Sequence, residues 1–509
     1  MTGSATSTPT PGLPLRSVAA LTGVFISALA SGLISRSGSL ALGDIRAELG
    51  IGIDGGSWLA TLYCSGELMV MPFAGWFAVT FSVRRFHTLV LWTSALIALA
   101  LPMVVNPQLA MAMKLVQGMA GGALVPLLMM MAMKLLPAPI RLYGLALYSL
   151  TATFVPNIAI WSVGMWSDGI EDLRWIAWQF LPAALIATAL VNWGMPKEEV
   201  KWSRFASVNW LGLIAGLFAL LCFGIGLAQG NRLDWFNSPL LRFCLISGAL
   251  GFLVFIASEW SHPAPFIRFQ LLGRRNLAVG FSAFVLMLIA MNSAAAVPME
   301  FLAVTQGYRP LQSAPIGLIV ALPQLFIGTA VAFLLYQKWI DGRALFSLGL
   351  ALIGLSCLLA SRLDASWTWH EFVFIQTMQA FGQPLAIIPM LFLTTSVVQP
   401  AEGPFIAGLV NCLRSLGALI AAAIIGRFDL VRDQFHQTML IDHFGHVQNH
   451  LPLPVSNISA LISAQVTALT TADKYLLLGW VALLLVPAGL LFMHVPAPGS
   501  GSNVKTEQS

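Results

Sequence analysis

Long apolar runs recur along almost the whole of this 509-residue chain, and they constrain its fold more than any other feature. About 20 apolar residues let a helix cross a bilayer once, and in lipid the backbone must satisfy its own hydrogen bonds within that helix. Charged residues make up only 9% of the chain, against about 25% in soluble domains, which excludes a water-soluble enzyme of this size. We therefore expect an all-α polytopic membrane protein with fourteen transmembrane helices near residues 17–42, 56–81, 86–105, 109–134, 141–166, 175–194, 208–228, 238–258, 277–299, 313–336, 343–361, 370–398, 404–427 and 475–494.

Basic residues are distributed unequally between the two sides of the membrane. An even number of spans places both termini on one side. Fourteen Lys and Arg residues then fall on that side, eight fall on the other, and four lie inside spans. Because short loops rich in Lys and Arg stay cytoplasmic, both termini are expected in the cytoplasm. The net charge of +5 reflects this bias, so it does not indicate nucleic-acid binding.

The chain carries a weak internal duplication. Gln117 and Gln379 align at an offset of 262 residues, which places spans 1–6 against spans 9–14. Transporters are often built from such repeats, with the substrate site near the bilayer midplane where the repeats meet. We predict a disordered cytoplasmic tail at 1–16, an N-terminal six-helix bundle at 17–194, two inserted helices with flanking cytoplasmic loops at 195–276, a C-terminal six-helix bundle at 277–494 with an outside loop at 428–474, and a cytoplasmic tail at 495–509.

Glu67 is the most informative single residue. It lies about eleven residues into the second span, which is close to the midplane at a rise of about 1.5 Å per residue. An ionisable group in hydrocarbon costs at least about 2.5–3.5 kcal/mol, so it persists only with a role or a partner. A carboxyl balanced between burial and a nearby cation can load and release a proton. We predict that Glu67 carries protons; a structural hydrogen bond or salt bridge is the alternative.

Basic and polar residues inside other spans are candidates for binding substrate or for pairing with charges. Arg414 lies near the middle of its span with Asn411 one turn earlier on the same face, and it can bind an anion or pair with the carboxyl. Lys114, Arg36 and Glu300 lie in the outer parts of their spans, where snorkelling to the interface is the alternative. Polar side chains that would line a cavity include Asn157, Asn292, Gln379 and Gln383.

Some chemistry is not indicated by the sequence. No Lys follows a Gly, so there is no Gly-Lys-Ser/Thr phosphate loop and ATP does not power this chain by itself. In segment 428–474, His443, His446 and His450 have a spacing compatible with a metal ligand set on a helix, but a solvated amphipathic loop is the preferred interpretation. No cofactor or metal is predicted, and the five scattered cysteines do not form a disulfide framework.

The order of several short motifs resembles the fourteen-span drug:proton antiporters of the major facilitator superfamily, the EmrB/QacA type. The resemblance covers residues 20–495 and depends on Gly56-Ser57-Trp58, Pro72, Gly75-Trp76, Gln117-Gly118, Arg174-Trp175, Pro182, Leu233-Asp234-Trp235-Phe236-Asn237-Ser238, Pro265-Phe266-Ile267, Arg275-Asn276-Leu277 and Asn411-x-x-Arg414. It implies two six-helix bundles plus two inserted helices, and alternating access about a central site.

The chain departs from the family pattern at four places. The usual Asp of span one is absent from 33–36, and Arg36 adds a cation there. The loop at 79–85 lacks its Asp, Lys114 replaces the Arg of span four, and the Gly-Pro pair of span five is replaced at 159–160. We infer that Glu67 has taken over the role of the lost acid.

The sequence therefore favours a proton-driven exporter of small amphipathic molecules, anionic or weakly acidic and aromatic, with the proton gradient as its energy source. An uncoupled facilitator or importer of a small organic solute is the alternative, and a membrane enzyme or scaffold is disfavoured because only 428–474 has room for a separate site. The resemblance implies location in a bacterial inner membrane, and a periplasmic adaptor and an outer-membrane channel as partners.

Overall fold

The computed structural model describes residues 14–399, 402–447 and 455–498, and these residues form helices joined by turns and loops, without a strand. The first part of the chain contains α1 Leu15–Leu40, α2 Leu42–Glu48, α3 Ile53–Val70, α4 Ala74–Phe81, α5 Val83–Ala100, α6 Pro107–Leu135, α7 Arg141–Gly164, α8 Trp175–Trp178 and α9 Phe180–Gly194. The rest contains α10 Trp210–Gln229, α11 Pro239–Ser261, α12 Arg275–Met291, α13 Ala296–Thr305, α14 Pro310–Leu335, α15 Gly342–Ala360, α16 Phe372–Thr395, α17 Gly403–Val447 and α18 Val455–Leu485. The all-α membrane fold expected from the sequence is confirmed.

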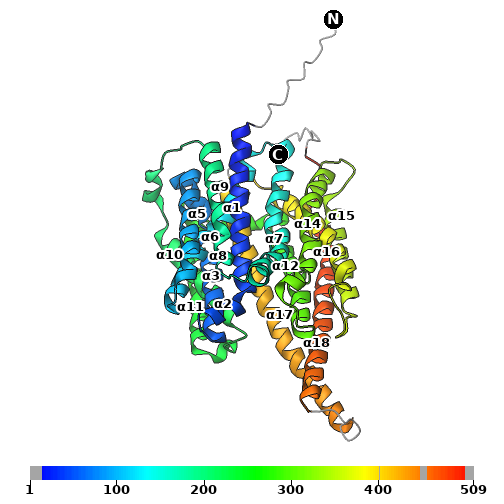
Figure 1. Ribbon diagram of the computed structural model, residues 1–509. Coiled ribbons are helices and arrows are strands. Elements are labelled where there is room, and N and C mark those ends of the chain that lie inside the picture. Colours follow the sequence, from blue (N-terminus) through cyan, green and yellow to red (C-terminus); the bar gives the residue numbers. More distant parts are fainter. Residues whose placement is uncertain (1–13, 400–401, 448–454, 499–509) are drawn as a thin grey trace.

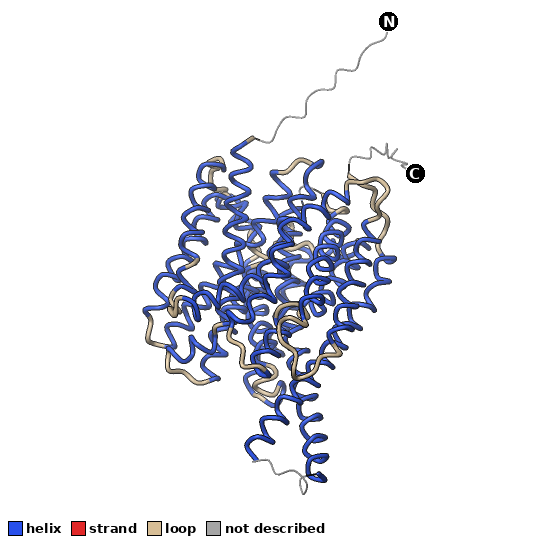
Figure 2. The backbone as a smooth tube through the Cα atoms, turned by 45° about the vertical axis from the view of Figure 1, so that its right-hand side comes forward, coloured by secondary structure: helices blue, strands red, loops and turns tan. Residues whose placement is uncertain are grey.

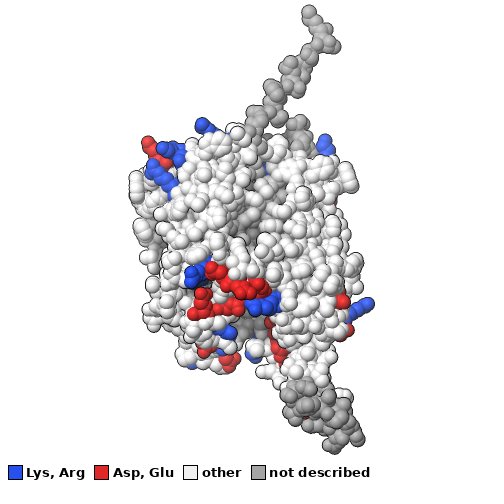
Figure 3. Space-filling model, viewed as in Figure 1, with Lys and Arg blue, Asp and Glu red and all other residues white. Residues whose placement is uncertain are grey.

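The body of the molecule has two distinct faces. The described chain begins at α1 and, after the short helix η9 (Val486–Leu491), ends near the same face, which we call the terminus-side face (Figure 1). The far ends of α17 and α18 project from the opposite face, which we call the hairpin-side face (Figures 1 and 2). Figure 3 shows charged side chains near the terminus-side rim and in a band toward the hairpin side, separated by a broad uncharged belt. Such a belt is what a bilayer-spanning protein presents to lipid.

Twelve helical segments of the described chain are long and apolar enough to cross a membrane, and the bent pair α3–α4 makes a thirteenth. α16 is also long, at 24 residues, but it contains Gln376, Gln379 and Gln383. These three buried amides lower its hydrophobicity, so α16 is the helix that decides between thirteen and fourteen spans. The count of fourteen stays a prediction.

Two of the expected continuous spans are broken. The second span bends by 60° between α3 and α4, around Pro72. Proline lacks a backbone N–H and clashes with the preceding turn, which explains a bend at this position. The ninth span is interrupted by a turn at 292–295 between α12 and α13. Both breaks lie in helices that contribute to the candidate site described below.

The expected outside loop at 428–474 is largely helical, so that expectation was wrong for its described part. α17 continues for 45 residues and α18 returns beside it. Asp473 joins the two helices: its carboxylate accepts hydrogen bonds from Arg432 Nε at 2.6 Å and is 2.7 Å from His436 Nε2. Of the three histidines with metal-like spacing, His443 is exposed, the side chain of His446 is not described, and His450 lies outside the described residues.

Close helix contacts hold the N-terminal half together. At Gly118 and Gly122 of α6, an added Cβ would collide with the backbone of Tyr63 and of Glu67 in α3. Small residues at four-residue spacing let helix backbones approach in this way. The contact fixes the part of α3 that carries Glu67 directly against α6.

Candidate functional site: a cavity between the two halves

A cavity of about 250 Å³ lies between the N-terminal and C-terminal halves. Its walls come from α1, α7, the α12–α13 break, α16 and α17. Four residues expected from the sequence to bind substrate line it: Arg36, Asn157, Asn292 and Gln383. Arg36 is the single charged side chain among the lining residues in the described part of the chain. The cavity is therefore mostly apolar, with one cation and three amides.

The amides of the cavity differ in how fully they are satisfied. Asn157 donates from Nδ2 to the carbonyl of Thr153 at 2.6 Å, while its buried Oδ1 has no partner among the described atoms. Gln383 Oε1 accepts a hydrogen bond from Gln324 at 3.0 Å. A buried polar atom without a partner is costly, so the free Oδ1 of Asn157 is an acceptor available to a bound molecule.

Glu67 is half-buried on α3 and does not itself line this cavity. The cations that act on its carboxyl are Arg414 and Arg36, and the Ser35 hydroxyl faces it. Neither arginine forms a 4.0 Å ion pair with it in the described structure. Arg36 also lines the cavity, so one side chain both acts on the carboxyl and contacts the space where a ligand would bind. The structure thus places Glu67 within the electrostatic reach of both Arg36 and Arg414.

Arg414 and Asn411 connect the two halves. Arg414 Nη1 donates to Thr151 Oγ1 of α7 at 3.1 Å, and Tyr148 of α7 donates its hydroxyl proton to Asn411 Oδ1 at 3.0 Å. Both contacts join residues 263 positions apart in sequence. Any rearrangement that separates α7 from α17 breaks these bonds, so both contacts depend on how the two halves are arranged.

Lys114 does not belong to the central cavity. Its Nζ donates to Gln117 Oε1 at 3.2 Å and lies 5.5 Å from the ring centre of Tyr63. It lines a separate cavity inside the N-terminal half. Lys114, a candidate from the sequence for binding substrate or pairing with a charge, therefore lies in a different cavity from Arg36.

Gln379 and Glu300 also lie outside the lining of the central cavity. Gln379 Nε2 donates to the hydroxyls of Ser293 and Ser356, each at 2.8 Å, and so holds the α12–α13 break. Glu300 lies 3.3 Å from Lys474 Nζ, which also contacts Asp429 at 2.9 Å. Gln379 and Glu300 therefore contact other protein side chains and do not line the central cavity.

Sequence reasoning missed Ser35 and Thr151, the hydroxyl groups that face Glu67 and Arg414. Serine and threonine are frequent in membrane helices, and nothing in their spacing marks these two. Each hydroxyl lies on a different helix from the charged residue that it faces. Their proximity is therefore seen only in the packed structure.

The terminus-side face is closed by contacts between the halves. An added Cβ on Gly75 of α4 would lie 2.6 Å from the carbonyl oxygen of Pro404, and the Leu142 amide donates to the Tyr336 hydroxyl at 3.2 Å. The cavity instead involves the hairpin-side end of α1 and residues 418 and 422 of α17. The described conformation is therefore closed toward the terminus side, with its cavity in the hairpin-side part of the interface.

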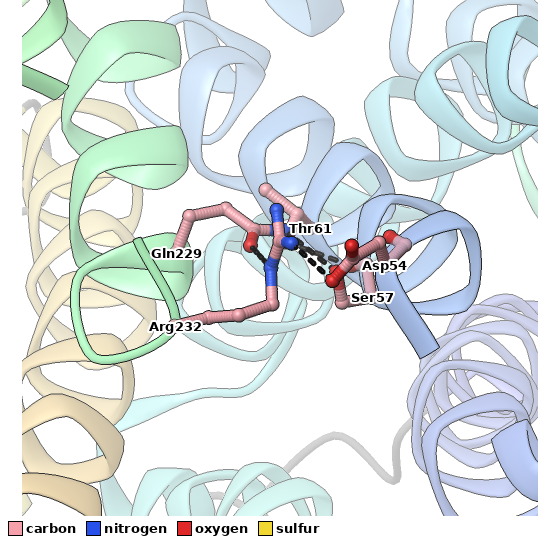
Figure 4. A network of polar contacts seen from close by, with 5 residues as sticks. All are labelled: Asp54, Ser57, Thr61, Gln229 and Arg232. Atoms are coloured by element: carbon pink, nitrogen blue, oxygen red, sulfur yellow. Dashed lines mark hydrogen bonds and ion pairs between the residues drawn. The ribbon is translucent and has the colours of Figure 1, made fainter. Parts of the chain in front are cut away.

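The inserted helix α10 braces the helix that carries Glu67 (Figure 4). Arg232 Nη1 lies 2.5 Å from Asp54 Oδ1, and its Nε donates to Gln229 Oε1 at 2.6 Å. Gln229 Nε2 in turn donates to Thr61 Oγ1 at 2.6 Å and to Ser57 Oγ at 3.3 Å. Because this network joins α10 and its following turn to α3, the insert and the N-terminal half contact each other as one packed unit along this helix.

Comparison with known proteins agrees with this architecture. The family model described as "Major Facilitator Superfamily" matches residues 21–207. The chain is 22% identical to the "Multidrug export protein EmrB" of Haemophilus influenzae over 86% of its length and 87% of that protein. It is also 22% identical to the "Fatty acid resistance protein FarB" of Neisseria gonorrhoeae, over 80% and 79% of the two chains.

A solved structure supports the fold independently of sequence. The human organic anion transporter MFSD10 (TETRAN) superimposes with a TM-score of 0.56 at 13% identity, covering 92% of this chain and 100% of that one. The family-model match, the relatives and this fold agree with the two halves and central cavity described above. The chain is thus similar to proteins of the major facilitator superfamily in its N-terminal part, and to EmrB-type multidrug exporters over most of its length.

Proposed function

We propose that this transporter exports small, weakly acidic aromatic compounds in exchange for protons, with Glu67 as the proton carrier. The observation that carries the proposal is the half-buried Glu67 carboxyl beside Arg36, the one charged residue of the central cavity. The apolar walls suit an aromatic ring, and the name of the FarB relative, a fatty acid resistance protein, points to acidic amphipathic compounds.

Charge and hydrogen bonding determine whether substrate and proton move together or in exchange. An anionic substrate would bind best when Glu67 is protonated and the two arginines are uncompensated, so anion and proton would travel together. A neutral weak acid that donates its O–H to the Glu67 carboxylate competes with the proton for the same oxygen atoms. Mutual exclusion of proton and substrate is the condition for exchange, and the two affinities are linked reciprocally. We therefore propose that the substrate binds in its neutral, hydrogen-bond-donating form.

Alternating access would then proceed by a rearrangement of the two halves that opens the cavity to one side of the membrane and then to the other. In the described conformation the cavity lies toward the hairpin side, where Glu67 would accept a proton after substrate leaves. Rearrangement of the halves would open the terminus side, where the proton leaves and substrate binds. We propose that the terminus side faces the cytoplasm of a bacterium, which agrees with the excess of Lys and Arg residues predicted on that side.

The test is proton release on binding. Detergent-solubilised protein in weakly buffered solution is titrated with 1-naphthol while a pH indicator dye is followed. Wild type is expected to release protons as naphthol binds, and its affinity should fall as the solution is acidified. Glu67→Gln should bind without releasing protons. Glu300→Gln is the matched control, because Glu300 lies outside the cavity and Lys474 keeps its contact with Asp429. Proton release that persists in Glu67→Gln contradicts the proposal.

A flux measurement separates exchange from the uncoupled alternative. Everted membrane vesicles should accumulate substrate when they are energised by a proton gradient, and a protonophore should abolish the accumulation. If accumulation survives the protonophore, the protein is not driven by protons.

We also propose a periplasmic adaptor, continued by an outer-membrane channel, as a partner of the helical extension. Val431, Phe435 and Met439 follow each other at four-residue spacing on α17 and are 50%, 47% and 57% exposed. Apolar residues at this spacing form one stripe on a helix, the kind of surface that packs against another helix. A photo-crosslinking amino acid placed at Phe435 in the native host should capture the adaptor; labelling of lipid alone would argue against it.

A further inference from the structure

A second cavity lies wholly within the N-terminal half. It holds about 190 Å³ between α1, α2, α3, α6, the segment after α5 and the start of α8. Most of its wall is apolar, with Ile34, Ile45, Leu59, Leu101, Ala110 and Ile176 among the lining residues. Its position in the N-terminal half separates it from the central cavity.

Two cations of the described chain line this cavity, Lys114 and Arg174. Arg174 is exposed at the mouth, whereas Lys114 is half-buried. Its Nζ has Gln117 Oε1 at 3.2 Å and the Tyr63 ring at 5.5 Å as neighbours. No carboxylate of the described chain lies within 4.0 Å of Nζ. The other amide atom of Gln117, Nε2, is buried and has no hydrogen-bond partner among the described atoms. A half-buried cation in an apolar cavity, without a carboxylate partner among the described residues, is an arrangement that a bound anion would satisfy.

The mouth of the cavity is charged but does not oppose an anion. Arg174 and Glu48 both line it and both are exposed, and their formal charges cancel. Lys114 then leaves the cavity with a net positive charge. An engineered protein cavity of about 150 Å³ is large enough to bind benzene, so about 190 Å³ suits one aromatic ring with a small substituent.

We propose that this cavity is a second ligand site that binds a single-ring aromatic carboxylate. The ring would fill the apolar part, and the carboxylate would accept a hydrogen bond from Lys114 Nζ. The site goes beyond the transport path, because it shares no lining residue with the central cavity.

The hairpin-side half of α1 is the wall between the two cavities. Ile34 and Gly38 face the N-terminal cavity, while Arg36 and Ser39 face the central one. Residues two positions apart on a helix point in different directions, as this division requires. A ligand bound beside Lys114 would therefore contact the same helical segment that presents Arg36 to the central cavity.

The test uses 4-bromobenzoate and the full-length protein in detergent. Calorimetry should show binding to wild type, and a structure of the complex should show the bromine in the N-terminal cavity. Lys114→Gln should weaken binding by about tenfold or more, since a hydrogen bond to a charged group is involved. Lys114→Arg keeps the charge and should retain most of the affinity.

A filling variant tests the location without removing the charge. A Cβ on Gly38 would meet only Lys114 Nζ, at 3.7 Å, so Gly38→Leu projects into the cavity and should abolish binding. Gly43→Leu is the matched control, because a Cβ there meets no atom within 4 Å and Gly43 does not line the cavity. All variants must elute as monodisperse protein. Unchanged affinity in Lys114→Gln or Gly38→Leu, bromine in the central cavity alone, or no binding to wild type would each overturn the proposal.

Discussion

Gly75 is the position at which a single methyl group should change the conformational equilibrium. It lies where α4 meets the start of α17, and an added Cβ would be 2.6 Å from the carbonyl oxygen of Pro404. Ordinary contact begins at 3.4 Å, so the two segments must separate by roughly 0.8 Å, the difference between these distances. Overpacking of this kind typically costs about 1–3 kcal/mol.

The overpacking caused by Gly75→Ala should destabilise one conformation only. Gly75→Ala strains the state in which the terminus-side face is closed, and it leaves the state in which α4 and α17 have parted without strain. A differential of about 1–3 kcal/mol corresponds to a shift of about 5- to 150-fold in an equilibrium constant. We therefore expect Gly75→Ala to populate a conformation open toward the terminus side.

Spin-label distance measurements can detect this shift. Labels at Arg85→Cys and Lys338→Cys lie on exposed positions of the two halves, in a background with the five native cysteines replaced. Gly75→Ala should add or enlarge a long-distance population. Gly273→Ala, where a Cβ meets no atom within 4 Å, is the matched control. A distance distribution unchanged by Gly75→Ala would refute the argument that this contact holds the face closed.

Two further predictions concern charged residues. Arg414→Ala should weaken binding of naphthalene-1-sulfonate about tenfold or more and leave binding of neutral 1-naphthol within about twofold, measured by calorimetry, because a charged hydrogen bond is lost only with the anion; equal losses would assign Arg414 a purely structural role. Hydrogen bonds from the Arg274 guanidinium lower the pKa of Glu402, outside the spans, so its contribution to stability is complete above the ordinary carboxyl pKa of about 4.3 and is lost as the pH falls through the lowered value. The melting temperature in detergent should therefore fall on acidification below about pH 4.3, and by less in Glu402→Gln; an equal fall in both proteins would contradict this assignment.

The membrane class and most helix positions could be read from the sequence because hydrophobicity and length determine them. The bend at Pro72 has a local cause that the sequence contains. The break between α12 and α13 does not, since it contains no proline and is held by Gln376 and Gln379 from α16. The helical extension of α17 and α18 was missed for a similar reason: its polar sequence reads as a solvated loop until Asp473 joins the two helices.

The candidate site was predictable as a set of residues but not as an arrangement. Charges in lipid are costly, which singled out Glu67, Arg36 and Arg414, and the structure does bring them near one another. Lys114 met the same criterion and yet belongs to another cavity, because α1 passes between it and the central space. Gln379 was grouped with the cavity by type, whereas only packing reveals that its amide faces Ser293 and Ser356. A position along a helix does not determine which neighbour the side chain meets.

The proposed role of Glu67 can be tested at the place in span one where the resemblance leads us to expect an acid. Arg36 occupies that region, where it acts on the Glu67 carboxyl and lines the central cavity. A cation there in the absence of an acid on the same helix needs a compensating charge from a neighbouring helix, and α3 provides one. The close contact of Gly118 and Gly122 with α3, together with the brace from Arg232 and Gln229, keeps that helix in place. If Glu67 has replaced the lost acid, then restoring an acid in α1 at Ser35 should rescue proton release in Glu67→Gln, whereas the same change in wild type should place two carboxyls at one site and impair exchange.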